Sequence, residues 1–105
     1  MKAVSVTELK EKLDNKENIK VLDVREDHER EIAKFTDFHI PMGEVLEHLD
    51  EIPKDVPVIV HCRSGQRSAT VIDLLEREHG YDNLYNLNGG ILSWANEIDK
   101  SLNIY

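Results

Sequence analysis

The chain has 105 residues, of which 32% are charged, and its formal net charge is -8. This length accommodates one domain, which we expect to span residues 1–105. So acidic a chain is a poor partner for nucleic acid or anionic membranes, and no apolar run is long enough to cross a bilayer. Because the N-terminal residues lack the apolar region of a secretion signal, we expect a cytoplasmic location.

The first half of the chain predicts alternating helices and strands. Ser5 and Glu8 have the spacing of a capping box, which opens a helix. The elements expected after it are a strand over residues 19–24, a short exposed helix over 26–34, a brief strand over 38–40 and a helix over 42–49. The acidic run from Glu26 to Glu31 indicates a solvated helix face.

The second half contains the clearest strand, residues 57–61, which is an almost continuous β-branched run. Strands of this kind are buried on both faces of a parallel sheet. A helix over 68–79 and a short strand over 84–86 follow. Gly89 and Gly90 then form a turn into a last helix that carries Trp94. The alternation predicts an α/β fold with a mainly parallel sheet.

Cys62 is the only cysteine, so it cannot form an intramolecular disulfide or a cysteine-based zinc site. A lone cysteine is usually a small buried apolar residue, but this one ends the buried strand where ligands gather in α/β sheets. Unpaired amides at the start of the next helix stabilise a thiolate, so we expect a lowered pKa and a nucleophilic sulfur. His61 should point to the opposite face and take a packing role.

The residues that follow the cysteine suit a small anion. Two of them are the only formally charged residues between positions 61 and 70, and both are positive: Arg63 and Arg67. Gly65 permits a tight turn around one atom. Ser64 and Ser68 can donate hydroxyl hydrogen bonds, and Ser68 can also cap the following helix.

Two reaction classes use a thiolate in such a setting. Cysteine-dependent phosphatases place an arginine after five intervening residues, but that position is Ser68 in this chain, and Arg67 comes one position early. The shorter loop favours a smaller cargo, a single sulfur atom on Cys62. The thiolate and the arginines alone leave a phosphatase or an arsenate reductase open as an alternative.

Three segments resemble the signatures of the rhodanese family, in the same order: Val21–Glu26, the loop 61–69, and Asn86–Ile91 followed by Trp94. The resemblance implies a rhodanese-like three-layer sandwich with a central five-stranded, mainly parallel sheet flanked by helices. It also implies a sulfurtransferase in which Cys62 takes sulfane sulfur from thiosulfate or another donor. The resulting persulfide would pass the sulfur to cyanide, a thiol or a protein acceptor. The resemblance implies no cofactor and no metal.

The resemblance also assigns roles to individual residues. Five loop residues are expected to bind the persulfide through their backbone amides: Arg63, Ser64, Gly65, Gln66 and Arg67. Asp23 and Arg25 are expected near the loop, ordering it through contacts with its arginines, and Ser68 is a further supporting residue. The segment 35–41 departs from the family's usual Gly-His-Ile-x-Gly-Ala pattern, which leaves the rim of the site and the choice of substrate open. A persulfide carrier or interaction module in a sulfur-relay pathway is the other interpretation of the same chemistry.

Overall fold

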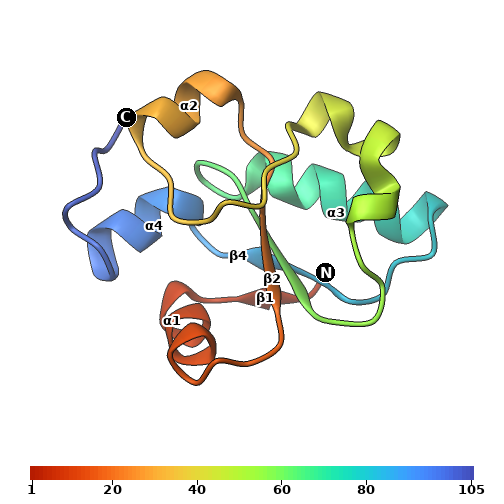
Figure 1. The fold of residues 1–105 in the computed structure, drawn as a ribbon, viewed down its shortest axis with the longest axis horizontal. Helices are drawn as coiled ribbons and strands as arrows, with labels where there is room; N and C mark the ends of the chain where they lie inside the picture. The colour runs from red at the N-terminus through yellow and green to blue at the C-terminus, as the bar shows by residue number, and fades with distance from the viewer.

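The computed structural model describes all residues from 1 to 105. Four strands alternate with helices along the chain (Figure 1). In chain order the elements are β1 (Ala3–Val4), α1 (Val6–Asp14), β2 (Lys20–Asp23), α2 (Asp27–Ile32), η1 (Met42–Glu51), β3 (Val58–His61), α3 (Gln66–Glu78), β4 (Leu84–Leu87) and α4 (Gly90–Glu97). No helix is both long enough and apolar enough to span a bilayer.

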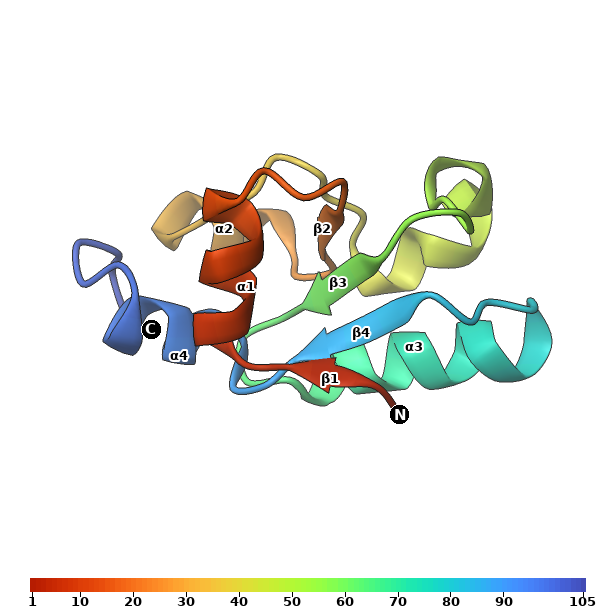
Figure 2. The same cartoon turned by 90° about the horizontal axis from the view of Figure 1, so that it is seen from below.

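The strands form one parallel sheet in the order β1-β4-β3-β2 (Figure 2). β3 is a central strand, and all four of its residues are buried. Val21 of β2 pairs with Ile59 of β3, and Ile59 in turn pairs with Tyr85 of β4. This central position explains the β-branched sequence of β3, since both faces of the strand meet apolar side chains.

Helices cover both faces of the sheet, and β3 supplies side chains alternately to each. Val58, Val60 and then Cys62 belong to the cluster of 13 buried residues that contains Val71, Ile72 and Leu75 of α3. Ile59 belongs to the second cluster, seven residues that include Val6 and Leu9 of α1 and Trp94 of α4. The period-two alternation of a strand therefore directs Cys62 toward α3.

The sheet has four strands rather than the five that the family resemblance implied, and β1 was not among the strands expected from the sequence. The brief strand expected over residues 38–40 is wrong. This segment makes only an isolated parallel bridge between Asp23 and His39, with Asp23 N–H donating to Phe38 O and Ile40 N–H donating to Asp23 O, each at 3.0 Å. Met42 N–H, after Pro41, still donates to Val24 O at 3.0 Å, but Arg25 N–H donates to the Asp23 carboxylate at 2.9 Å, so the regular ladder does not continue. The parallel sheet and the flanking helices are confirmed.

Several helix boundaries differ from those expected. The capping box at Ser5 and Glu8 is confirmed, since each side chain accepts a hydrogen bond from the backbone amide of the other residue. The segment after Pro41 is a 3-10 helix with non-helical backbone angles at His48, rather than an α-helix. α3 begins at Gln66, two positions before the expected start, so its first turn overlaps the loop that follows Cys62.

Candidate functional site

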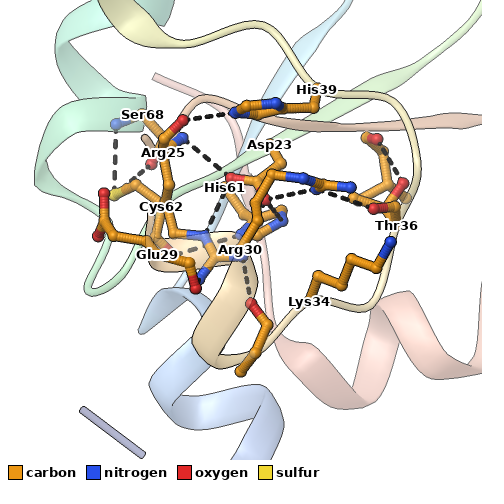
Figure 3. Close-up of polar contacts among 12 residues, drawn as sticks. Asp23, Arg25, Glu29, Arg30, Lys34, Thr36, His39, His61, Cys62 and Ser68 are labelled. Atoms are coloured by element: carbon orange, nitrogen blue, oxygen red, sulfur yellow. Dashed lines mark hydrogen bonds and ion pairs between the residues drawn. The ribbon is translucent and has the colours of Figure 1, made fainter. Parts of the chain in front are cut away.

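Cys62 lies at the carboxyl end of β3, in a loop of seven residues that we call the Cys62 loop (residues 62–68). Its side chain is buried, with 1% of the residue exposed. The sulfur accepts a hydrogen bond from the Gly65 amide at 3.1 Å. It also accepts one from the Ser68 amide at 3.5 Å and lies 3.4 Å from the Ser68 hydroxyl oxygen (Figure 3). The loop therefore closes around one atom, as its tight turn predicts.

Two opposing effects set the pKa of Cys62. Burial alone would raise it, because the charged form loses its hydration. The Ser68 hydroxyl, when its proton faces the sulfur, and the amides of Ser68, Gly65 and Ser64 favour the thiolate. Together they hold the pKa of Cys62 below its usual value. Both loop arginines are bonded to other groups, so the polar contacts of the sulfur are with neutral donors.

The backbone of the Cys62 loop is held from outside by α4. Ile91 N–H donates to Cys62 O at 3.0 Å, and Leu92 N–H donates to Arg63 O at 3.2 Å. Gly90 has φ +58, and a Cβ atom there would lie 2.4 Å from Arg63 O. The glycine pair at the start of α4 therefore does more than form a turn, because Gly90 lets this helix approach the loop closely enough to bond its carbonyls.

Asn86 of β4 also holds the loop, and sequence reasoning did not single it out. Its Nδ2 donates to Gly65 O at 3.1 Å, and its Oδ1 accepts from the Ser68 hydroxyl at 2.6 Å. β4 runs beside β3, with Asn86 paired to Val60, so both strands end next to the loop. A polar residue at the end of a neighbouring parallel strand was the available sequence signal.

The arginines of the loop are occupied by groups distant in sequence. Arg67 forms two hydrogen bonds with the Glu29 carboxylate, at 2.6 and 2.7 Å. Arg63 donates from Nε to the main-chain oxygen of Tyr105 at 2.7 Å, with its guanidinium near the Tyr105 ring. In Figure 1 the C-terminus accordingly lies beside α2. The two expected arginines therefore do lie at the loop, but each of them is already bonded to another group.

Glu29 corrects the expectation that the acidic run is a solvated face. It lies on α2 with only 6% of the residue exposed. The hydrogen bonds from Arg67 are the largest cause that lowers the pKa of Glu29, to about 2, and the Glu26 amide and the Tyr105 hydroxyl add to the effect. The same pair raises the pKa of Arg67. A six-residue helix with acidic residues on several sides gave no sequence signal for this burial.

Asp23 and Arg25 do lie near the loop, but they make no bond to its arginines, and that expected contact is wrong. Both are fully buried and pair with each other at 2.9 Å, and Arg30 also donates to Asp23 at 2.9 Å (Figure 3). Burial would raise the pKa of Asp23, yet its hydrogen bonds with Arg25 and the charge of His61 lower it to about 2. Arg25 is connected to the loop indirectly. The Tyr105 hydroxyl accepts a hydrogen bond from Arg25 and donates one to Glu29, which in turn binds Arg67 of the loop.

The remaining expected residues divide between the rim and the opposite face. Ser64 and Gln66 are exposed, so their side chains lie at the rim of the site. His61 is fully buried and packs against Phe35, with ring centroids 4.6 Å apart. Burial lowers the pKa of His61 to about 4, so the ring is neutral near pH 7. The packing role expected for His61 is confirmed.

The unusual segment 35–41 lies along β2 and packs on the domain rather than forming a separate rim. Phe35 stacks on Trp94 with centroids 4.4 Å apart, and His39 Nε2 is 2.6 Å from Arg25 O. The surface hollows of the protein, including one lined by Phe38 and Pro53, contain no residue of the Cys62 loop. The Cys62 loop borders none of these hollows, and its Gly65 and Ser68 amides close directly on the buried sulfur. No group of three or more metal-ligating side chains is present.

Comparison with known proteins agrees with this geometry. The model of the family described as "Rhodanese-like domain" matches residues 5–97. The chain is 36% identical to "Putative sulfurtransferase YtwF" of Bacillus subtilis, covering 92% of this chain and 93% of that one, and 35% identical to "Sulfurtransferase" of Allochromatium vinosum, covering 83% and 81%. A rhodanese-like domain protein of Staphylococcus aureus has a similar structure, with TM-score 0.84, 32% identity, and coverage of 100% and 99%. The chain belongs to the rhodanese-like domain family and is related to sulfurtransferases.

Gly90 provides a direct test of how α4 shapes the loop. We expect Gly90→Ala to destabilise the fold by about 2–4 kcal/mol, because the added Cβ meets backbone oxygen and the positive φ is strained. Urea denaturation at pH 7 measures this loss. Gly43→Ala is the matched control, since nothing lies within 4 Å of a Cβ at that position. Equal stability of the two variants would show that the close approach of α4 is unimportant.

The Glu29–Arg67 pair predicts a pH-dependent contribution to stability. The pKa of Glu29 in the fold is about 2, below its ordinary value of 4.5, so the contribution is present above about pH 4.5 and disappears as the pH falls toward 2. We expect Glu29→Gln to lower the free energy of unfolding by about 2 kcal/mol at pH 7. The difference from the wild type should shrink at pH 3. Glu31→Gln, on an exposed position of α2, serves as control. A difference that stays constant with pH contradicts the assignment.

Proposed function

We propose that this protein is a sulfurtransferase that carries sulfane sulfur as a persulfide on Cys62. One observation supports this most directly: a buried sulfur at the end of β3 receives backbone amides from a loop that closes around it. Such donors stabilise the thiolate form of the cysteine and, after reaction, a negative charge on the outer sulfur. Membership of the rhodanese-like family supports the same chemistry.

The reaction that we propose has two displacement steps. The Cys62 thiolate attacks the outer sulfur of a donor such as thiosulfate, forming a new S–S bond. The S–S bond of the donor breaks, and its electron pair leaves with sulfite. A thiophilic acceptor, such as cyanide, a thiol or a protein, then attacks the outer sulfur, and Cys62 departs as a thiolate. A covalent intermediate of this kind gives ping-pong kinetics.

The proposed roles of the other residues follow from their positions. Residues 62–67 bind the persulfide through backbone amides, as the hydrogen bond from Gly65 to the sulfur suggests. Arg63 and Arg67 contribute positive potential that attracts an anionic donor to an otherwise acidic protein. Asp23 and Arg25 support the loop indirectly, through Glu29 and Tyr105. None of these roles requires a cofactor.

The enclosure around Cys62 favours one sulfur atom over a phosphoryl group. Binding a phosphoryl group would need several donors arranged around three oxygens, and a guanidinium is the usual clamp. In this structure the two terminal nitrogens of the Arg67 guanidinium already bond the Glu29 carboxylate. We therefore propose sulfur transfer in preference to phosphate or arsenate chemistry, within one domain that spans residues 1–105.

Intact-mass measurement after treatment with thiosulfate tests the proposal. We expect the wild-type protein to gain the mass of one sulfur atom, and we expect cyanide to remove that mass with formation of thiocyanate. Cys62→Ser should show neither change, because no other cysteine can carry the sulfur. Retained thiocyanate formation in Cys62→Ser would overturn the assignment of the nucleophile.

The same measurement separates an enzyme from a relay carrier. Rapid loading from thiosulfate is expected for a free-standing sulfurtransferase. Slow loading from thiosulfate, together with rapid loading from a protein persulfide such as that of a cysteine desulfurase, would favour the carrier. Failure of every donor, combined with Cys62-dependent hydrolysis of an aryl phosphate, would replace sulfur transfer with the phosphatase alternative.

A further inference from the structure

Asn86 bonds two of the residues that contact the sulfur, although it does not touch the sulfur itself. Its amide group lies between Gly65 O, at 3.1 Å from Nδ2, and the Ser68 hydroxyl, at 2.6 Å from Oδ1. Gly65 and Ser68 are the residues whose amides bond Cys62 Sγ. Asn86 comes from β4, so it joins a neighbouring strand to both ends of this short segment.

The donors and acceptors at this point allow one arrangement. A backbone carbonyl only accepts, so Gly65 O requires the NH₂ side of the Asn86 amide. The amide oxygen must then face Ser68. That oxygen also only accepts, so the single hydroxyl proton of Ser68 is directed at Asn86. A lone pair of Ser68 Oγ is left facing Cys62 Sγ at 3.4 Å.

The distances also indicate that the Ser68 hydroxyl donates to Asn86 rather than to Cys62. An O···O separation of 2.6 Å is short for a hydroxyl donating to a carbonyl-type oxygen, which indicates a good hydrogen bond. The contact between Ser68 Oγ and the sulfur is longer, and either atom there could be the donor. Ser68 is fully buried on α3, so the hydroxyl has no solvent as another partner.

We propose that Asn86 is a positioning residue that turns the Ser68 hydroxyl proton away from Cys62, so that backbone amides are the main donors to the thiolate. In the thiol form, Cys62 S–H then donates to Ser68 Oγ. In the thiolate form, the sulfur has one hydrogen bond fewer than Ser68 could supply. A less strongly bonded thiolate is more basic and a better nucleophile. The inference rests on the proposed function only in taking Cys62 as the reacting sulfur.

A double-mutant cycle of Ser68→Ala and Asn86→Leu tests the direction of the proton. The readout is the pH dependence of alkylation by iodoacetamide, which reports the thiolate of the single cysteine. In the wild-type background we expect Ser68→Ala to leave the apparent pKa unchanged or slightly lower it, because the thiol loses an acceptor. In the Asn86→Leu background the freed hydroxyl can donate to the thiolate. Ser68→Ala should there raise the apparent pKa by about one unit.

This comparison is insensitive to general loosening of the loop. Asn86→Leu also removes the bond to Gly65 O, but that bond is absent from both proteins compared in the Asn86→Leu background. A second readout is the limiting alkylation rate at pH values above the pKa. We expect it to be about threefold lower in Asn86→Leu than in Asn86→Leu/Ser68→Ala, because nucleophilicity follows basicity with a coefficient of about 0.4–0.5.

The outcomes either support or overturn the proposal. An equal upward shift of the pKa by Ser68→Ala in both backgrounds would show that Ser68 donates to the sulfur regardless of Asn86. A larger upward shift in the wild-type background would have the same meaning. Neither readout needs a sulfur donor, so a protein that fails to accept sulfur from thiosulfate can still confirm or contradict this inference.

If Asn86→Leu fails to fold by circular dichroism, the S–H stretching band in the infrared replaces the cycle. The chain has one cysteine, so the band of the thiol form belongs to Cys62 alone. We expect a frequency lowered by donation to Ser68 Oγ, and a shift to higher frequency in Ser68→Ala. An unchanged band in Ser68→Ala would overturn the proposal, because the thiol would then not use Ser68 as its acceptor.

Discussion

The constraint on which the site depends is the short connection between β3 and α3. Within a few residues the chain must turn from a buried strand into a helix, and the polar backbone groups of this connection need partners. In the structure, the carbonyl and amide groups of the connection find different partners. Carbonyls of Cys62 and Arg63 bond amides of α4, while amides of Gly65 and Ser68 bond the sulfur. The side chain of the cysteine thus completes the hydrogen bonding of its own loop.

The charged side chains around this loop form a second layer, in which every buried charge has an opposite partner. Asp23 bonds both Arg25 and Arg30, and Glu29 bonds Arg67. Pairing is required because an isolated charge in the interior is strongly unfavourable. Tyr105 joins the two ion pairs through its hydroxyl, which contacts Arg25 and Glu29. The layer fixes α2 and the C-terminal residues against the loop without placing a cation on the sulfur.

The sequence allowed prediction of those features that depend on local pattern. The β-branched run before Cys62 correctly indicated a buried parallel strand, and the alternation along it correctly placed His61 and Cys62 on opposite faces. The five-stranded sheet was implied by the family resemblance, whereas the brief strand over residues 38–40 was expected from the local pattern. Those residues make only a single bridge, because Arg25 N–H bonds the Asp23 carboxylate and does not continue the ladder. Local pattern predicts direction and burial, but not how many neighbours a strand edge acquires.

Side-chain partners were the least predictable part of the site. Glu29 and Arg67 are 38 positions apart, and Ser68 and Asn86 are 18 positions apart. No periodicity in the sequence encodes such contacts, because they arise only when α2 and β4 pack beside the Cys62 loop. The expected pairing of Asp23 with the loop arginines failed for the same reason. Several carboxylates compete for a few guanidinium groups, and only the fold decides which pairs meet.

The choice of neutral donors around the sulfur has a chemical consequence. A guanidinium in contact with Cys62 would lower the pKa of the thiol further, but it would also reduce the basicity on which nucleophilic attack depends. Amides stabilise a thiolate with partial charges and stay fixed, so in the reaction that we propose little reorganisation is needed when charge moves to an outer sulfur. Since the Glu29 carboxylate binds Arg67, the arginine contributes to the local field without contacting the sulfur. A site arranged in this way suits the proposed reaction, in which Cys62 both accepts and releases a sulfur atom.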